Sequence, residues 1–431
     1  MNRFAVGLLT AGCAVFPALA SAPADTGMPG ASTPPTTVSA SLPVMTGTGG
    51  SAHRATPTSE ARTQPEEAPV PPPPDMSQLP ASERPVARPG VRQRYSCVSG
   101  GHFPDTAEMG DRLWGQRLFR LPELRTLTTG RSVRIAVIDT GVARNPRLAG
   151  RLIAGGDFVA GGDGLTDCDG HGTLVAGIAA ASVDAGTGFA GVAPAAEVIS
   201  IRQSSPSYVV ADPTGTEVQA GDLQTLAMAV LHAVDLGADV INISEASCAP
   251  PGVAGAAELR AAIHRAVQRD VVIIAAAGNL GGGRAGECPE TPTPGTVVYP
   301  AWFADDVLAV ASVGPGEVPS GFNYPGPWVR VAAPGERLVS LAVEGAGLTD
   351  QLPGGNARTP IDGTSFAAPS VAGLAALIRA RYPRLTAGQV IDRITATASQ
   401  HASGRTDTTG YGLVDPVAAV TRGPAVLPPP G

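Results

Sequence analysis

Ser365 stands in a short segment, Gly363 to Pro369, that leads directly into an apolar run ending at Ile378. The pattern predicts a helix that begins at the serine, where unpaired N–H groups and the positive end of the helix dipole favour an anion. Pro369 has no N–H to donate to the Ser365 carbonyl, which loosens the first turn. Such a serine could attack an acyl group, or it could simply cap the helix.

A serine acts as a nucleophile at neutral pH when a base takes its proton and a carboxylate orients that base. Asp139 ends an apolar strand predicted over residues 135–139. In open α/β proteins, functional sites form at the carboxyl ends of such strands. His171 lies between two glycines and opens an apolar helical run that reaches Ala180. The remaining histidines lack such a setting: His53, His102, His232, His264 and His401.

These residues belong to three consecutive motifs: Asp139-Thr140-Gly141, Gly170-His171-Gly172-Thr173 and Gly363-Thr364-Ser365-Phe366-Ala367-Ala368-Pro369. Their types and order resemble the three signatures of the subtilisin family of serine proteases. The resemblance covers about residues 131–422. It implies a serine endopeptidase in which Ser365 attacks the peptide bond, His171 transfers the proton and Asp139 orients His171.

A fourth segment supports the resemblance. The apolar strand predicted over residues 271–276 leads into Ala277-Gly278-Asn279, which matches the family segment whose asparagine donates to the oxyanion. Loss of such a donor lowers turnover about 100- to 1,000-fold in subtilisin. The resemblance therefore implies that Asn279 and the Ser365 N–H hold the oxyanion.

Strands and helices alternate along the chain. Strands are predicted over residues 135–139, 197–201, 240–243, 271–276 and 307–311. One helix is predicted to begin at His171, and four more are predicted over residues 223–236, 256–268, 365–381 and 386–398. Such alternation implies an α/β fold with a mostly parallel central sheet and helices on both faces, the three-layer arrangement of subtilisins. Residues 204–221 interrupt it as a long polar loop beside the expected cleft.

Relatives in this family lay an extended peptide along exposed strand edges. Ser244-Glu245-Ala246 matches one such edge, and Ala276-Ala277-Gly278 matches the opposite pocket wall. Glu245 stands where a small or apolar residue is usual. It could favour a basic or polar substrate side chain, or it could be a solvated strand end, and the sequence leaves both alternatives open.

The N-terminus has the pattern of an export signal: Arg3, an apolar stretch continuing to Phe16, and Ala18-Leu19-Ala20 as a cleavage site. Residues 10–13 partly match a lipoprotein box, so lipidation of Cys13 is an alternative. The next residues are rich in Pro, Ser and Thr and bury too little to order themselves. The sequence predicts five parts: a signal peptide (1–20), a disordered linker (21–90), an extension packing on the catalytic domain (91–130), the catalytic domain (131–422) and a Pro-rich tail (423–431).

Four cysteines remain after the signal peptide, an even number that predicts two disulfides in an exported protein. Of the three possible pairings we favour Cys97 with Cys168 and Cys248 with Cys288. The first would tie the extension to the loop before His171. The second would join two loops that leave neighbouring strands.

The net charge of −7 and the absence of a basic cluster argue against a nucleic-acid partner. Four acidic residues gather before His171 and could suggest a calcium loop: Asp157, Asp163, Asp167 and Asp169. Their spacing matches no recognised loop, so we assign no metal and expect no cofactor.

Four further segments resemble one branch of the subtilases, the mycosins: Asp167–His171, Ser200–Gln203, Asn242–Glu245 and Gly326–Val329. The resemblance implies a membrane-associated protease of a type VII secretion system, with a wrapping N-terminal extension, a C-terminal membrane helix and a partly structural role. The chain as given has no such helix, so attachment is implied by the resemblance alone. The expected partners are a protein or peptide substrate and the secretion complex, on the extracytoplasmic side of the membrane or outside the cell.

Overall fold

The computed structural model describes residues 69–81, 84–99, 109–212, 214–281, 288–354, 359–399 and 404–422. The predicted signal peptide, Cys13, the predicted tail and three histidines, His53, His102 and His401, lie outside these ranges. No helix within the described ranges has the length and apolarity needed to cross a bilayer.

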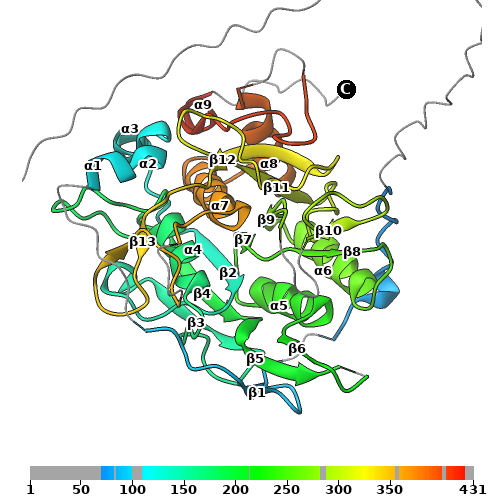
Figure 1. Ribbon diagram of the computed structural model, residues 1–431. Helices are drawn as coiled ribbons and strands as arrows, with labels where there is room; N and C mark the ends of the chain where they lie inside the picture. The colour runs from blue at the N-terminus through cyan, green and yellow to red at the C-terminus, as the bar shows by residue number, and fades with distance from the viewer. Residues whose placement is uncertain are drawn as a thin grey trace, which may run out of the picture. The chain divides into compact units, whose positions relative to one another are not determined.

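A seven-stranded sheet forms the centre of the fold (Figure 1), with strand order β12-β11-β9-β7-β2-β4-β3. Every neighbouring pair is parallel, which confirms the predicted fold class. The strands are β2 (Arg134–Asp139), β3 (Leu152–Asp157), β4 (Glu197–Arg202), β7 (Val240–Ile243), β9 (Val272–Ala276), β11 (Val307–Val313) and β12 (Val329–Pro334).

Helices cover both faces of this sheet, because its strands are apolar on both sides. In β2, Ile135 and Val137 join one buried cluster, whereas Ala136 and Ile138 join another. The first cluster takes in α4 (His171–Ala180), α7 (Thr364–Arg381), α8 (Ala387–Thr397) and α9 (Pro416–Thr421), and the second takes in α5 (Leu223–Asp235) and α6 (Ala256–Gln268). A strand buried on both faces is typical of a parallel sheet.

The N-terminal segment lies against the α/β domain. It contains η1 (Met76–Gln78), β1 (Arg92–Gln93), α1 (Met109–Arg112), α2 (Trp114–Leu118) and α3 (Leu121–Leu127). Trp302 Nε1 donates to the Pro69 carbonyl at 2.7 Å, so contacts begin well before Val91, the predicted start of the extension. Phe119, Leu121 and Leu124 are buried in the first cluster.

The prediction of a polar loop over residues 204–221 was wrong. This segment forms β5 (Ser205–Ala211) and β6 (Glu217–Ala220), and β1 pairs with β5 to give a small antiparallel sheet. The partner strand β1 is more than a hundred residues away in sequence, so local composition could not reveal the pairing. Short elements complete the description: η2 (Pro146–Leu148), β8 (Ser247–Ala249) paired with β10 (Val297–Tyr299), and β13 (Ser340–Leu341) paired with β14 (Leu348–Thr349).

Candidate active site

Asp139 and His171 meet where β2 ends and α4 begins. Asp139 is fully buried, and its Oδ1 lies 2.7 Å from His171 Nδ1. The Thr140 N–H also donates to this oxygen at 2.8 Å. Gly172 permits the approach, because a Cβ there would lie 2.0 Å from the Gly141 carbonyl oxygen. The carboxylate therefore fixes the orientation of the ring and leaves the other ring nitrogen for a proton transfer.

The charges around His171 favour its protonated form. Burial alone would lower the pKa of this imidazole, but the charge and hydrogen bond of Asp139, together with the charges of Glu245 and Asp167, raise its pKa to about 9. An imidazole with such surroundings stabilises the cation that forms when it accepts a proton from a hydroxyl.

Asp167 holds the loop that carries this histidine. Its two oxygens accept five hydrogen bonds, from the N–H groups of Asp169, Gly170 and Thr173 and from the hydroxyls of Thr140 and Thr173. Burial raises the pKa of Asp167 to about 6, although the bonds from Thr173 and Thr140 oppose the rise. The sequence placed Asp167 in an acidic group and in the mycosin-like segment Asp167–His171, without a role for its side chain. The signal was its position between two threonine-containing motifs, Asp139-Thr140-Gly141 and Gly170-His171-Gly172-Thr173.

Ser365 lies in the first turn of α7, as predicted. The adjacent Phe366 ring has its centroid 5.1 Å from that of His171, so the first turn of α7 faces the start of α4. The Ser244 hydroxyl donates to the Ser365 carbonyl at 2.6 Å. The structure thus brings the serine, the histidine and the aspartate together at the carboxyl ends of the central strands.

Asn279 is held beside Ser365 by Thr364. The N–H and the hydroxyl of Thr364 lie 3.0 and 2.9 Å from Asn279 Oδ1 and donate to it. Because a backbone N–H can only donate, the atom that it meets is the amide oxygen, and the NH₂ group lies on the other side. A Cβ built on Gly363 would lie 3.4 Å from Asn279 Nδ2, which locates the donor beside the turn that precedes Ser365.

The two predicted substrate-binding segments leave adjacent strands. Ser244-Glu245-Ala246 follows β7, Ala277-Gly278 follows Ala276 at the end of β9, and Ile243 pairs with Ala275. Glu245 accepts a hydrogen bond from the Ser204 hydroxyl. Burial and the charge of Asp139 raise the pKa of Glu245. The side chain is therefore half-buried and hydrogen-bonded to the protein.

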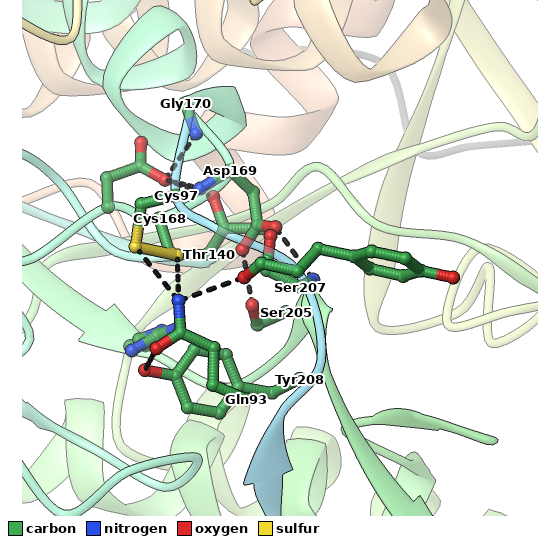
Figure 2. Close-up of a disulfide and its surroundings, with 12 residues drawn as sticks. Gln93, Cys97, Thr140, Cys168, Asp169, Gly170, Ser205, Ser207 and Tyr208 are labelled. Carbon is green, nitrogen blue, oxygen red and sulfur yellow. Dashed lines mark hydrogen bonds between the residues drawn. A yellow bond between two sulfur atoms is a disulfide. The ribbon is translucent and has the colours of Figure 1, made fainter. Parts of the chain in front are cut away.

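Two disulfides join the predicted pairs, Cys97 with Cys168 and Cys248 with Cys288. Figure 2 shows the first, with the Gln93 amide close to both sulfur atoms. The Val98 N–H donates to the Cys168 carbonyl at 2.9 Å. The disulfide thus joins the N-terminal segment to the loop that precedes His171.

The hairpin β5–β6 contacts the same loop through Asp169. The Ser205 hydroxyl and the Ser207 N–H both donate to its carboxylate (Figure 2). The acidic residues before His171 thus bond to the protein itself. In the part of the chain that the structure describes, no group of three or more His, Cys, Asp or Glu side chains is arranged to hold a metal ion.

Comparisons with known proteins agree with this geometry. The subtilase family model matches residues 130–412. Mycosin-4 of Mycobacterium tuberculosis is 48% identical over 367 residues, which cover 81% of this chain and 78% of the relative. A solved structure of "a serine protease MycP1, an essential component of the type VII (ESX-1) secretion system" is 41% identical with a TM-score of 0.74, covering 81% of this chain and 99% of that one. A chain of an intact ESX-5 inner membrane complex is 38% identical with a TM-score of 0.73, covering 84% and 90%. The chain therefore belongs to the subtilase family of serine proteases, in its mycosin branch.

Proposed function

We propose that this chain is an exported serine endopeptidase that hydrolyses peptide bonds through Ser365, His171 and Asp139. His171 takes the proton of the Ser365 hydroxyl as the oxygen attacks the scissile carbonyl, and then gives it to the leaving amine. Water, deprotonated by the same imidazole, releases the acyl group and restores the serine. The observation that carries the proposal is the 2.7 Å hydrogen bond between His171 and Asp139, formed beside the first turn of α7.

The Asn279 amide and the Ser365 N–H are proposed to hold the oxyanion of the tetrahedral intermediate. The two hydrogen bonds from Thr364 support this role, because they fix the carboxamide before substrate arrives. A donor that needs no reorganisation contributes most to stabilising the developing charge.

The peptide substrate is proposed to lie between Ser244-Glu245-Ala246 and Ala276-Ala277-Gly278. The partial burial of Glu245 and its bond to Ser204 favour a part in recognising a polar or basic substrate side chain. A peptide-library cleavage profile of wild type against Glu245→Ala tests this. We expect Glu245→Ala to lose cleavage of sites with basic or polar residues, and identical profiles would remove Glu245 from specificity.

Proteolysis itself is tested by the purified mature chain acting on a mixed peptide library. Wild type is expected to cleave, and Ser365→Ala is expected to lose essentially all cleavage, since removal of the nucleophile alone costs about a millionfold in turnover in subtilisin. Equal cleavage by both proteins would overturn the assignment of Ser365.

We also propose that the protein acts on the extracytoplasmic side of the membrane, with a type VII secretion complex as its partner. The apolar N-terminus and the two disulfides support export. The similarity to a chain found in the ESX-5 inner membrane complex supports the partner and raises a second function, that of a structural subunit. Secretion in a deletion strain complemented with Ser365→Ala separates the two: full rescue favours the structural subunit, and loss of secretion favours proteolysis.

A further inference from the structure

The carbonyl of Ser365 lacks its ordinary partner within α7. In an α-helix the N–H of residue i+4 donates to the carbonyl of residue i. For Ser365 that residue is Pro369, which has no N–H and lies inside the helix. The N–H of the peptide group that follows Ser365 donates to the Gly363 carbonyl at 3.0 Å, but its carbonyl oxygen has no i+4 N–H to accept from.

The Ser244 hydroxyl takes the place of the missing donor. Its Oγ lies 2.6 Å from the Ser365 carbonyl oxygen. The Asn242 Nδ2 group in turn donates to Ser244 Oγ at 2.8 Å. Because the hydroxyl accepts from Asn242, its single proton is directed to Ser365. Asn242 and Ser244 are 0% and 1% exposed, so water does not compete for this bond.

The bond joins α7 to the strand that lies between the other parts of the site. Ser244 directly follows β7, whose neighbours in the sheet are β2 and β9. Asp139 ends β2, and Asn279 follows shortly after β9. A hydrogen bond from the end of β7 therefore places the first turn of α7 in a fixed position relative to both residues.

We propose that Ser244 is a positioning residue: its hydroxyl replaces the helix hydrogen bond that Pro369 removes and holds Ser365 where His171 can deprotonate it. The inference rests on the proposed role of Ser365. It gives Ser244 a function separate from any contact of its backbone with a peptide substrate.

The test compares wild type, S244A, P369A and the double variant S244A/P369A. The readout is the second-order rate of Ser365 labelling by a small fluorophosphonate, which has no peptide chain to bind along the strand edge. Alanine at position 369 restores an N–H for the Ser365 carbonyl. We expect S244A to label about tenfold more slowly, because a small displacement of a reacting group costs at least that much. P369A is expected to stay near the wild-type rate, and the double variant to recover most of the loss.

A merely structural hydroxyl would give a different pattern. A wild-type labelling rate in S244A, or a folded double variant as slow as S244A, would overturn the proposal. If P369A does not fold, the pair S244T and S244V decides, since these side chains have nearly the same shape and only threonine keeps the hydroxyl. Labelling of S244T about tenfold faster than S244V supports the proposal, and equal rates overturn it. Absence of label on wild-type Ser365 would instead contradict the proposed function.

Discussion

The carboxylates around His171 decide at which pH the site can work. Deprotonation of Ser365 requires a neutral imidazole, but Asp139, Glu245 and Asp167 raise the pKa of His171 to about 9 against the effect of burial. The fraction of neutral imidazole therefore increases as the pH rises toward 9. At the scale of single residues, the site is electrostatically poised for alkaline conditions.

Replacing Glu245 by glutamine should make the enzyme more active near neutral pH. The substitution removes one negative charge that favours the imidazolium, so the pKa of His171 falls. Measured on a substrate without basic or polar side chains, the acid limb of the kcat/KM profile is expected to move to lower pH, with activity about two- to fivefold higher at pH 7–8. The matched control is Glu317→Gln, at an exposed position remote in sequence from the site motifs. An unchanged profile in Glu245→Gln would contradict this account of the charges.

Asp167→Asn should weaken both the fold and the reaction. Each oxygen of Asp167 accepts at least two hydrogen bonds. The asparagine NH₂ group can only donate, so it would point its hydrogens at these donors and lose their bonds. We expect a loss of about 2–3 kcal/mol in the free energy of unfolding, and a fall in kcat because the histidine loop loses its anchor. Thermal unfolding and kcat measured on the same samples check this. The control is Asp163→Asn, at an exposed acidic residue of the same group.

The pKa of Asp167 also predicts the direction of a stability change with pH. The folded-state pKa of about 6 lies above the ordinary value of 3.8, so the folded protein binds more protons between these two values. The contribution of this group to stability therefore falls as the pH rises from about 4 to 6. Plotted against pH, the free energy of unfolding of wild type and of Asp167→Ala should have different slopes between about pH 4 and 6. Parallel plots would contradict the raised pKa of Asp167.

At the scale of elements, local patterns predicted the central layer well. The strand predicted over residues 240–243 and the helix over 256–268 have the bounds of β7 and α6. Apolar runs and amphipathic periodicity determine such elements. The prediction missed β3, since its two glycines suggest a turn, and β12, which ends in proline. It also missed the hairpin β5–β6, because its pairing with β1 is a long-range contact.

The disulfide between Cys97 and Cys168 should stabilise the loop before His171. It joins residues 71 apart in sequence, and removing such a cross-link costs about 2–5 kcal/mol. We expect the double variant Cys97→Ser/Cys168→Ser to unfold at lower temperature and to label more slowly with a fluorophosphonate. The double variant Cys248→Ser/Cys288→Ser is the matched control for loss of a cross-link. If only the melting temperature fell in both, the first disulfide would have no special effect on the site.

At the scale of the whole molecule, a buried arginine holds the N-terminal segment to the domain. Arg260 pairs with Asp306 at 2.8 Å, lies over the Phe303 ring and donates to the Pro72 carbonyl at 3.4 Å. Another contact, between Arg92 and Glu217, lies on the surface. Burial makes the first pair much more sensitive to the loss of one partner than the second.

Arg260→Ala should therefore destabilise the protein by about 3 kcal/mol, because the buried Asp306 loses its guanidinium partner and is left with the His264 ring at 3.1 Å. Glu217→Gln should cost at most about 1 kcal/mol, since exposed pairs are screened by water and salt. Denaturant unfolding measures both, and limited proteolysis of residues 69–81 reports whether the segment is released. Equal effects of the two variants would contradict a special role of the buried Arg260 in attaching the N-terminal segment.

The sequence motifs located the principal residues of the candidate site, but not the residues that support them. Asp139, His171 and Ser365 stand in motifs with distinctive neighbours. Ser204 acts through a hydrogen bond to Glu245, which is distant in sequence, and no local pattern reveals that contact. Asp167 stands between two motifs, but its bond to the Thr140 hydroxyl forms only where the end of β2 meets the loop before His171. Ser244 was identified for its backbone, whereas the bond of its side chain to Ser365 depends on how α7 packs on the end of β7.

The most direct test of the account is labelling of purified wild type and Ser365→Ala with a serine-directed fluorophosphonate, followed by mass spectrometry of the modified peptide. We expect stoichiometric label on Ser365 in wild type and none in Ser365→Ala. Label at another residue, or no label on folded wild-type protein, would contradict an assembled triad of Asp139, His171 and Ser365.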